Sequence, residues 1–241
     1  MLSQILVEIQ QYQQNNKKVL VVFDLDSTLF NVSPRTERIL KDFAEVPLNQ
    51  IRFPKETQAL KNIKTQHTDW GITDSLSRMN LTENTEFLEA VQAYWQKHFF
   101  SNHYLQFDSL YDGALEYVRD LDQLGVEIIY LTGRDVDRMG PGTFQVLHDW
   151  GFPMHHRARL ELKPHKSMND AQFKTDFVIA ADKEGYDKIY FFENEPVNLV
   201  HLQENGPHVE MIFFDSTHSR KAEPPQGIKS IVNFLKSTKE S

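Results

Sequence analysis

The run of residues 19–23, Val-Leu-Val-Val-Phe, is the sequence feature that most constrains the fold, because it is wholly apolar and is followed at once by Asp24 and Asp26. A valine-rich apolar run of this length predicts a strand buried on both faces, which is typical of a parallel sheet. In open α/β sheets, ligands bind beyond the carboxyl ends of the strands. Asp24 and Asp26 are therefore expected at the ligand-binding edge of a sheet.

Strand and helix patterns alternate along most of the remaining chain. Further strands are predicted at 126–131, around Leu160 and Leu162, at 188–192 and at 209–214. Helices are predicted after Asp112, from Pro141 with Phe144, Leu147 and Trp150 facing the core, from Asn169, from Pro196 and at 228–235. This alternation predicts an α/β fold, a doubly wound parallel sheet of the Rossmann-like kind.

Residues 34–108 interrupt the alternation. They predict a helix from Pro34, a short helix near 56–63 and a long amphipathic helix over 84–100. The aromatic stripe of this last helix, from Phe87 to Phe99, is interpreted as packing and not as a ligand box. We therefore expect a helical cap domain at 34–108 and an α/β core made of residues 1–33 and 109–241.

Polar residues follow two other predicted strands. Thr132 and Gly133 come after the strand at 126–131, and Glu193 and Asn194 come after the strand at 188–192. Since parallel strands end at the same edge of a sheet, these residues are expected beside Asp24 and Asp26. Carboxylate oxygens there would suit Mg²⁺, and one aspartate could also attack phosphorus.

The segment Asp24-Leu25-Asp26-Ser27-Thr28, followed by Thr132 at a later strand end, resembles the haloacid dehalogenase-like superfamily of phosphohydrolases. The resemblance covers residues 19–33 and 109–214. It implies that Asp24 is the nucleophile that forms an aspartyl-phosphate and that Asp26 is the general acid and base. Dehalogenase members usually lack the second aspartate, so Asp26 favours phosphoryl chemistry.

The same resemblance implies roles for the other strand-end residues. Thr132 and Gly133 would bind the substrate phosphate. The metal would be Mg²⁺, held by Asp24, the main-chain carbonyl of Asp26, Glu193 and Asn194. The family usually carries an aspartate pair, or an aspartate and a second acid, where this chain has Glu193-Asn194. If Asn194 replaces a charged ligand, the metal site lacks one negative charge.

Two lysines could supply the cation that the family places beside the nucleophile. Lys174, in the run Asp-Ala-Gln-Phe-Lys, is similar to the pattern of one subgroup, and Lys163, in Lys-Pro, is similar to that of another. The pattern favours Lys174, which would then contact Asp24 and the phosphate. Arg134, in the turn after Thr132, is expected to be a solvated side chain and is left out of the catalytic set.

Composition restricts the environment and the partners. A formal charge of −8 at pH 7 argues against a nucleic-acid partner, and the absence of cysteine excludes disulfides, thiolate zinc sites and cysteine nucleophiles. No apolar run approaches the roughly 18 residues needed to span a bilayer. The first residues do not fit a signal peptide, because Glu8 interrupts their apolar positions. We expect a cytoplasmic protein with no membrane partner.

The resulting hypothesis is a Mg²⁺-dependent phosphatase acting on a small phosphorylated metabolite, with residues 34–108 as a lid. A phosphotransferase or phosphomutase would use the same core residues. A binding or regulatory protein with weak catalysis is the alternative outside enzymology, suggested by Asn194 and by the choice between two lysines. The identity of the substrate and the oligomeric state are left open.

Overall fold

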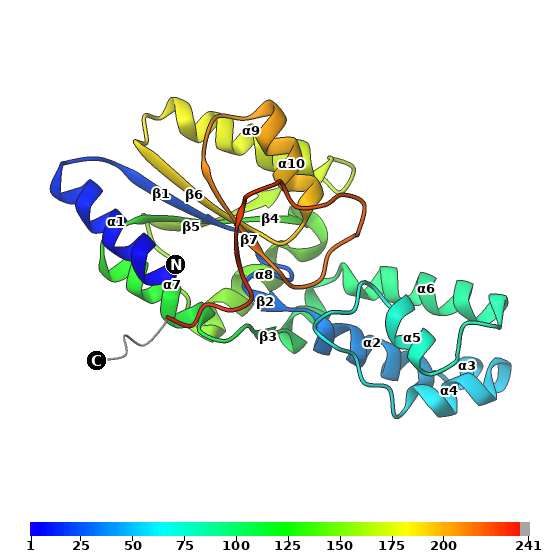
Figure 1. Ribbon diagram of the computed structural model, residues 1–241. Helices are drawn as coiled ribbons and strands as arrows, with labels where there is room; N and C mark the ends of the chain where they lie inside the picture. Colours follow the sequence, from blue (N-terminus) through cyan, green and yellow to red (C-terminus); the bar gives the residue numbers. More distant parts are fainter. Residues whose placement is uncertain (237–241) are drawn as a thin grey trace, which may run out of the picture.

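The computed structural model describes residues 1–236, so residues 237–241 of the predicted core range lie outside it. Its main sheet is parallel, in the order β5-β4-β1-β6-β7-β8 (Figure 1). The strands are β1 (Val19–Phe23), β4 (Glu127–Asp135), β5 (Ala158–Lys163), β6 (Lys188–Glu193), β7 (Glu210–Phe214) and β8 (Lys229–Ile231). The predicted doubly wound α/β fold is confirmed.

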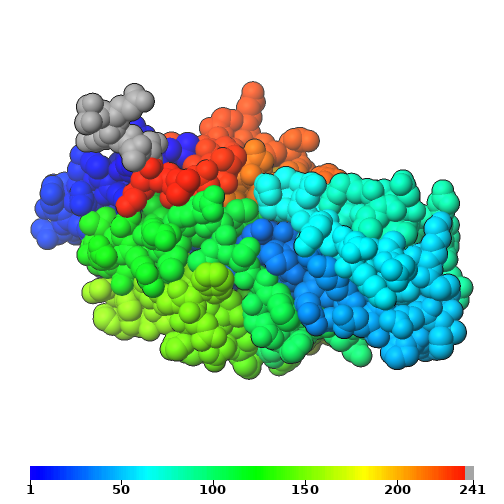
Figure 2. All heavy atoms as spheres, turned by 90° about the horizontal axis from the view of Figure 1, so that it is seen from below, coloured from blue at the N-terminus to red at the C-terminus, as the bar shows by residue number. Residues whose placement is uncertain are grey.

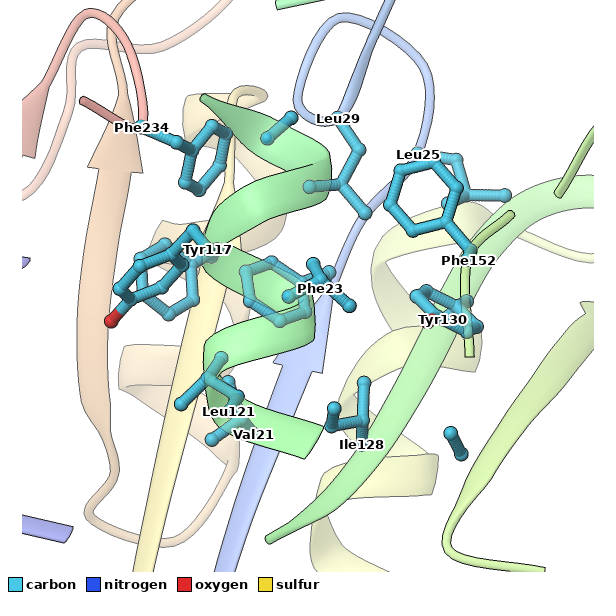
Figure 3. Close-up of a cluster of buried hydrophobic side chains, with 14 of the residues drawn as sticks. Val21, Phe23, Leu25, Leu29, Tyr117, Leu121, Ile128, Tyr130, Phe152 and Phe234 are labelled. Atoms are coloured by element: carbon cyan, nitrogen blue, oxygen red, sulfur yellow. The ribbon is translucent and has the colours of Figure 1, made fainter. Parts of the chain in front are cut away.

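Helices cover both faces of this sheet, which explains why the central strand is apolar on every side. On one face lie α1 (Leu2–Gln14), α7 (Ala114–Gln123) and α8 (Val136–Trp150); on the other lie α9 (Asp170–Lys183) and α10 (Pro196–Asn205). Val21 and Phe23 of β1 point into the first layer, where Phe23 packs against Tyr117 and Phe234 (Figure 3). Leu20 and Val22 point into the second layer.

Residues 33–107 form a helical segment beside the sheet (Figures 1 and 2). It contains α2 (Ser33–Glu45), α3 (Pro47–Arg52), α4 (Pro54–Leu60), α5 (Thr73–Arg78), α6 (Thr85–Phe99) and the 3₁₀ helix η1 (Asn102–Phe107). A proline opens each of α2, α3 and α4, where the missing N–H costs nothing. The segment has its own apolar cluster, which includes Phe43, Phe53 and Phe87.

The helical segment is joined to the sheet part by two short strands that lie side by side. β2 (Phe30–Asn31) leads into the segment and β3 (Ser109–Leu110) leads out of it, and the two pair antiparallel. The segment therefore begins and ends at neighbouring points in space, although the two points are far apart in the sequence.

Two sequence-based expectations are wrong in detail. The predicted helix at 228–235 is instead the strand β8, which pairs with the open edge of β7. Ile228, Ile231, Val232 and Leu235 imitate a helical stripe, but Val232 and Leu235 are exposed.

The helix predicted from Pro141 begins earlier, at Val136, because the Asp135 side chain caps it by accepting a hydrogen bond from the N–H of Arg138. Pro141 therefore lies inside α8. The earlier start also changes which face is buried. Leu147 faces the core as expected, whereas Phe144 and Trp150 are exposed.

No helix among residues 1–236 is both long enough and apolar enough to cross a membrane.

Candidate active site

A cavity of about 530 Å³ lies between the carboxyl ends of the central strands and the helical segment. The sheet side of its wall contains Asp24, Asp26, Gly133, Lys174, Glu193 and Asn194. The opposite wall comes from the helical segment and includes Thr36, Trp70, Trp95 and Phe99. The parallel sheet thus brings to one cavity residues that are far apart in the sequence, as the strand-end positions predict.

Asp24 is buried at the end of β1 and shares a lysine with a second acid. The ammonium of Lys174, from the second turn of α9, lies 2.5 Å from Asp24 Oδ1 and 2.6 Å from Glu193 Oε2. The Thr28 hydroxyl donates to the other oxygen of Asp24 at 3.1 Å. The arrangement orients the Asp24 carboxylate from both sides.

The charges in this group do not cancel, because two buried carboxylates face one ammonium. Burial raises the pKa of Asp24 to about 7; the ammonium of Lys174 acts in the opposite direction, and the charge of Glu193 adds to the increase. Burial alone would lower the pKa of Lys174, but the two carboxylates outweigh it and raise that pKa, so the lysine is protonated. A further cation would favour the ionised form of Asp24.

Oxygen atoms dominate the part of the cavity where a metal ion is expected. Asp24 Oδ2 and Asn194 Oδ1 both lie within hydrogen-bond distance of the Thr28 hydroxyl, at 3.1 and 3.2 Å, so the two acceptors lie near one another. The Asn194 amide is fixed from its other end, where its nitrogen donates to the carbonyl of Thr217. Oxygen donors and an uncompensated negative charge fit Mg²⁺.

Glu193 is less available than its position at the end of β6 suggests. One of its oxygens accepts from the backbone N–H of Glu195 at 2.9 Å, and the other accepts from Lys174 and, at 3.1 Å, from the amide of Asn198. Among the described residues, no three histidine, aspartate or glutamate side chains are grouped as a metal site. The residues present therefore fit a metal ion that takes Asp24, the Asn194 amide and main-chain or water oxygens.

Asp26 belongs to a group of four charged side chains, which we call the ion cluster: Asp26, Arg35, Asp108 and Arg134. Arg35, Asp108 and Arg134 are buried, whereas Asp26, which lines the cavity, is half-buried. Arg134 Nη2 lies 2.5 Å and Arg35 Nη2 2.8 Å from Asp26 Oδ1. Arg35 Nε donates to Asp108 Oδ1 at 2.7 Å, and Arg134 Nη2 lies 3.0 Å from Asp108 Oδ2. Burial would raise the pKa of Asp26, but the two guanidinium groups outweigh it and hold that pKa well below its ordinary value.

The ion cluster corrects one expectation and adds two residues. Arg134 was expected to be solvated, but only 2% of it is exposed. Its guanidinium is drawn inward because Asp26 and Asp108 are both there to neutralise it. Arg35 and Asp108 were not predicted. Arg35 could have been found in the sequence, because it is a charged residue four positions before Ile39 on the buried face of α2. Nothing in the local sequence marks Asp108.

Thr132 and Gly133 lie inside β4, which continues to Asp135 and does not stop at the predicted end at 131; its register with β5 becomes irregular between Thr132 and Asp135. Thr132 is buried and its hydroxyl accepts a hydrogen bond from the backbone N–H of Arg134 at 3.2 Å; it is not among the described residues that line the cavity, whereas Gly133 is. A Cβ on Gly133 would lie 2.7 Å from a carboxylate oxygen of Asp170, so a larger residue would crowd this wall.

The two candidate lysines have different partners. Lys174 contacts Asp24 and Glu193, while Lys163, at the end of β5, forms an ion pair with Asp170. Asp170 lines the cavity and lies against Gly133, which is predicted to bind the phosphate. Lys163 itself does not line the cavity and reaches this part of its wall only through Asp170.

The geometry agrees with the comparison of the chain with known proteins. The family model of haloacid dehalogenase-like hydrolases matches residues 19–196, which include all six predicted strand-end residues, the two aspartates among them. The chain belongs to the haloacid dehalogenase-like hydrolases. The resemblance seen in the sequence is confirmed, and the protein is a hydrolase of this family. No curated protein matches it in sequence.

Several solved structures show the same fold. Protein tyrosine kinase A (PtkA) of Mycobacterium tuberculosis is 16% identical, with a TM-score of 0.55 over 90% of this chain and 94% of that chain. CbbY of Rhodobacter sphaeroides in complex with phosphate is 12% identical, with a TM-score of 0.52 over 89% and 94%. A protein of Haemophilus somnus 129PT described as a predicted phosphoglycolate phosphatase is 14% identical, with a TM-score of 0.51 over 89% and 94%.

Proposed function

We propose that this haloacid dehalogenase-like hydrolase is a Mg²⁺-dependent phosphatase that hydrolyses a small phosphomonoester through an aspartyl-phosphate on Asp24. The observation that carries the proposal is the buried Asp24 carboxylate at the cavity wall, with the Lys174 ammonium 2.5 Å from it. A buried lysine beside a buried carboxylate both orients that group and offers charge to an incoming phosphate.

In the first step, an oxygen of Asp24 attacks phosphorus and the bond between phosphorus and the leaving oxygen breaks. Lys174 holds Asp24 and stabilises charge on the phosphate oxygens. The backbone around Gly133 approaches the phosphate closely, since no side chain stands in the way. A bound Mg²⁺ would neutralise the nucleophile and the phosphate together, with Asp24 and the Asn194 amide among its ligands.

Asp26 is the group that would exchange protons. Both arginines hold its Oδ1, and its Oδ2 makes no hydrogen bond to another described residue. Asp26 also lines the cavity. Because the two arginines keep Asp26 ionised in the free protein, we assign to Oδ2 the relay of the proton that a monoanionic phosphate ester carries to the leaving oxygen, and the later removal of a proton from the water that hydrolyses the acyl phosphate. Arg35 and Arg134 would keep the carboxylate in one orientation during both steps.

The helical segment would act as a cap over this site, with the boundaries 34–108 for the cap and 1–33 and 109–241 for the core. This assignment is supported by the separate apolar cluster of the segment, by its contribution to one wall of the cavity, and by its two adjacent connections β2 and β3. A cap in this place would exclude water from the first step and restrict the substrate to small molecules.

The test is hydrolysis of a generic aryl phosphate by the purified protein. We expect inorganic phosphate to be released with Mg²⁺, no release after removal of the metal with a chelator, and recovery when Mg²⁺ is added back. Release that persists in chelator would contradict the metal assignment. A phosphorylated acceptor alcohol in place of inorganic phosphate would instead indicate a phosphotransferase.

The covalent mechanism is tested with Asp24→Asn, which removes the nucleophile with almost no change in shape. We expect turnover to be lost while the circular dichroism spectrum is unchanged. Asp187→Asn is the matched control, because Asp187 lies just before β6, at the end opposite Glu193, and accepts a hydrogen bond from the backbone N–H of Lys18. Equal rates for the two variants would refute the role of Asp24.

A further inference from the structure

Aromatic rings from the helical segment form a continuous part of the cavity wall. Trp95 and Phe99 lie four residues apart on one face of α6, with ring centroids 4.7 Å apart, and Phe100 lies 5.1 Å from Phe99. Trp70 lines the same cavity. The packing expected for the aromatic stripe therefore holds only in part: Phe87 is buried in the apolar cluster of the segment, Trp95 packs against that cluster and also lines the cavity, and Phe99 lines the cavity.

The rings are held in place by their neighbours. The indole N–H of Trp95 donates to the Thr36 hydroxyl at 3.3 Å, and the guanidinium of Arg35 lies 4.5 Å from the ring centroid of Phe99. The polar edge of Trp95 is thus occupied by the protein itself. What these residues offer to a ligand is an oriented apolar surface made of two rings inclined by 39°, on which another planar ring can stack against one face and touch the edge of its neighbour.

The charges around the cavity limit the ligand to one phosphate. Within the part of the chain that the structure describes, only two cationic side chains line the cavity, Lys174 and Arg134, and both belong to its sheet side and are already bonded to carboxylates. The charged residue that the helical segment contributes is an acid, Asp69, which is paired with Arg78 at 2.5 Å. A second anionic group near the aromatic wall would therefore have no cation to pair with.

Two free amides lie beside the aromatic wall. Gln92 and Gln96 line the cavity, and they stand four residues apart on α6, next to Trp95. Neither side-chain amide makes a hydrogen bond to another side chain or to the backbone within residues 1–236. An amide offers one acceptor and two donors, which is the pattern that the edge of a nitrogen heterocycle can use.

We infer, resting on the proposed phosphatase activity, that the substrate is a phosphomonoester whose other part is a planar aromatic ring and which carries no second anionic group. The phosphate lies at Asp24 and Lys174, and the ring stacks on Trp95 and Phe99. A nucleoside monophosphate and a simple arylmethyl phosphate share this chemistry. Sugar bisphosphates and phosphorylated carboxylic acids do not fit, because their second anion would face the aromatic wall or Asp69.

The experiment compares kcat/KM within two pairs of substrates that have matched leaving groups, in the presence of Mg²⁺. One pair is a nucleoside 5′-monophosphate and ribose 5-phosphate, and the other is benzyl phosphate and cyclohexylmethyl phosphate. Base–aromatic stacking predicts that the aromatic member of each pair is favoured by about 5- to 150-fold. A larger ratio in the nucleoside pair identifies a nucleotide as the source of the ring, and a larger ratio in the benzyl pair identifies a simple aryl group.

Trp95→Leu should reduce both ratios at least fivefold. Trp150→Leu is the matched control, since Trp150 is an exposed tryptophan on α8 that does not line the cavity. It should leave both ratios as they are. A nucleoside 3′,5′-bisphosphate should be a poorer substrate than the corresponding 5′-monophosphate. Ratios near one in both pairs, or an equal effect of the two tryptophan variants, would overturn the inference and leave the phosphatase proposal standing.

A binding measurement separates this inference from the proposed function. Titration of the Asp24→Asn variant with the nucleoside 5′-monophosphate and with ribose 5-phosphate reports ring recognition without turnover. Preferential binding of the nucleotide or of benzyl phosphate by this variant, together with no hydrolysis of either compound by the wild-type protein, would refute the phosphatase proposal and keep the ring site. Equal binding of aromatic and non-aromatic members would refute the ring site.

Discussion

Replacing Arg35 by Met tests whether the ion cluster stabilises the fold. Arg35 is fully buried and donates to Asp108, to Asp26 at 2.8 Å and to the carbonyl of Phe99 at 3.3 Å. With methionine in its place, the buried carboxylate of Asp108 and the half-buried carboxylate of Asp26 would share the single guanidinium of Arg134. Breaking a buried ion pair by removing one partner costs about 3–5 kcal/mol. For a chain of this size, that loss lowers the midpoint of thermal unfolding by about 6–20 °C.

Arg52→Met is the matched control for Arg35→Met. Arg52 also pairs with an acid, Glu86, and its guanidinium lies over a phenylalanine, at 5.1 Å from the Phe53 centroid. It differs in burial, since the side chains of the Arg52 pair are 50% and 62% exposed. An exposed pair contributes about 0–1 kcal/mol. Both variants remove an ion pair and a contact with a phenylalanine ring, so the difference between their free energies of unfolding reports the effect of burial.

The assay is urea denaturation followed by circular dichroism and by tryptophan fluorescence, because agreement between the two probes tests two-state unfolding. Adding Asp108→Asn to Arg35→Met should cost less than the sum of the single variants, since one carboxylate then faces one guanidinium again. If Arg35→Met and Arg52→Met lowered the free energy of unfolding by amounts within about 1 kcal/mol of each other, the reasoning from buried charge would be refuted.

Two other predictions concern single charged groups. Lys174→Ala should lower kcat/KM for an aryl phosphate by about 10²–10³-fold, as expected for a preorganised charge contact, whereas Lys163→Ala should cost less than tenfold; the reverse order in steady-state kinetics would assign the role to Lys163. Burial would raise the pKa of Asp135, but its hydrogen bonds and ion pair with Arg138 hold that pKa below the ordinary 3.8. The stabilisation is therefore present above pH 3.8 and is lost as the pH falls through the folded-state pKa. The difference in free energy of unfolding between the wild type and Asp135→Asn should shrink in acid; a difference that stayed constant down to about pH 2 would contradict the assignment.

The sequence predicts the sheet and its catalytic edge because those signals are local. The β1 run and the two aspartates after it are adjacent in the chain, and burial on both faces requires apolar residues at every position of β1. The same local logic misplaces the end of the chain. Residues 228–235 carry a helical spacing of apolar residues, but three of them, 229–231, pair with the open edge of β7 as β8, and no local pattern reveals that edge.

The ion cluster could be predicted only in part. Arg35, Ile39 and Phe43 share one face of α2, so a charge on a buried face is visible in the sequence and implies a partner. The partner, Asp108, lies 73 residues further along the chain. It meets Arg35 only because the helical segment returns to its starting point, and that return is a property of the tertiary structure.

Because β2 and β3 pair with one another, the helical segment between them could be removed or replaced without a change in the sheet. Asn31 and Ser109 are register partners, so a two-residue turn such as Asn-Gly could join them without moving either strand. Excising the intervening residues would remove one base and one acid of the ion cluster, Arg35 and Asp108. Arg134 would remain opposite Asp26 with its charge matched. The sheet could thus lose this segment, or take a different one, with its backbone path and its charge balance intact.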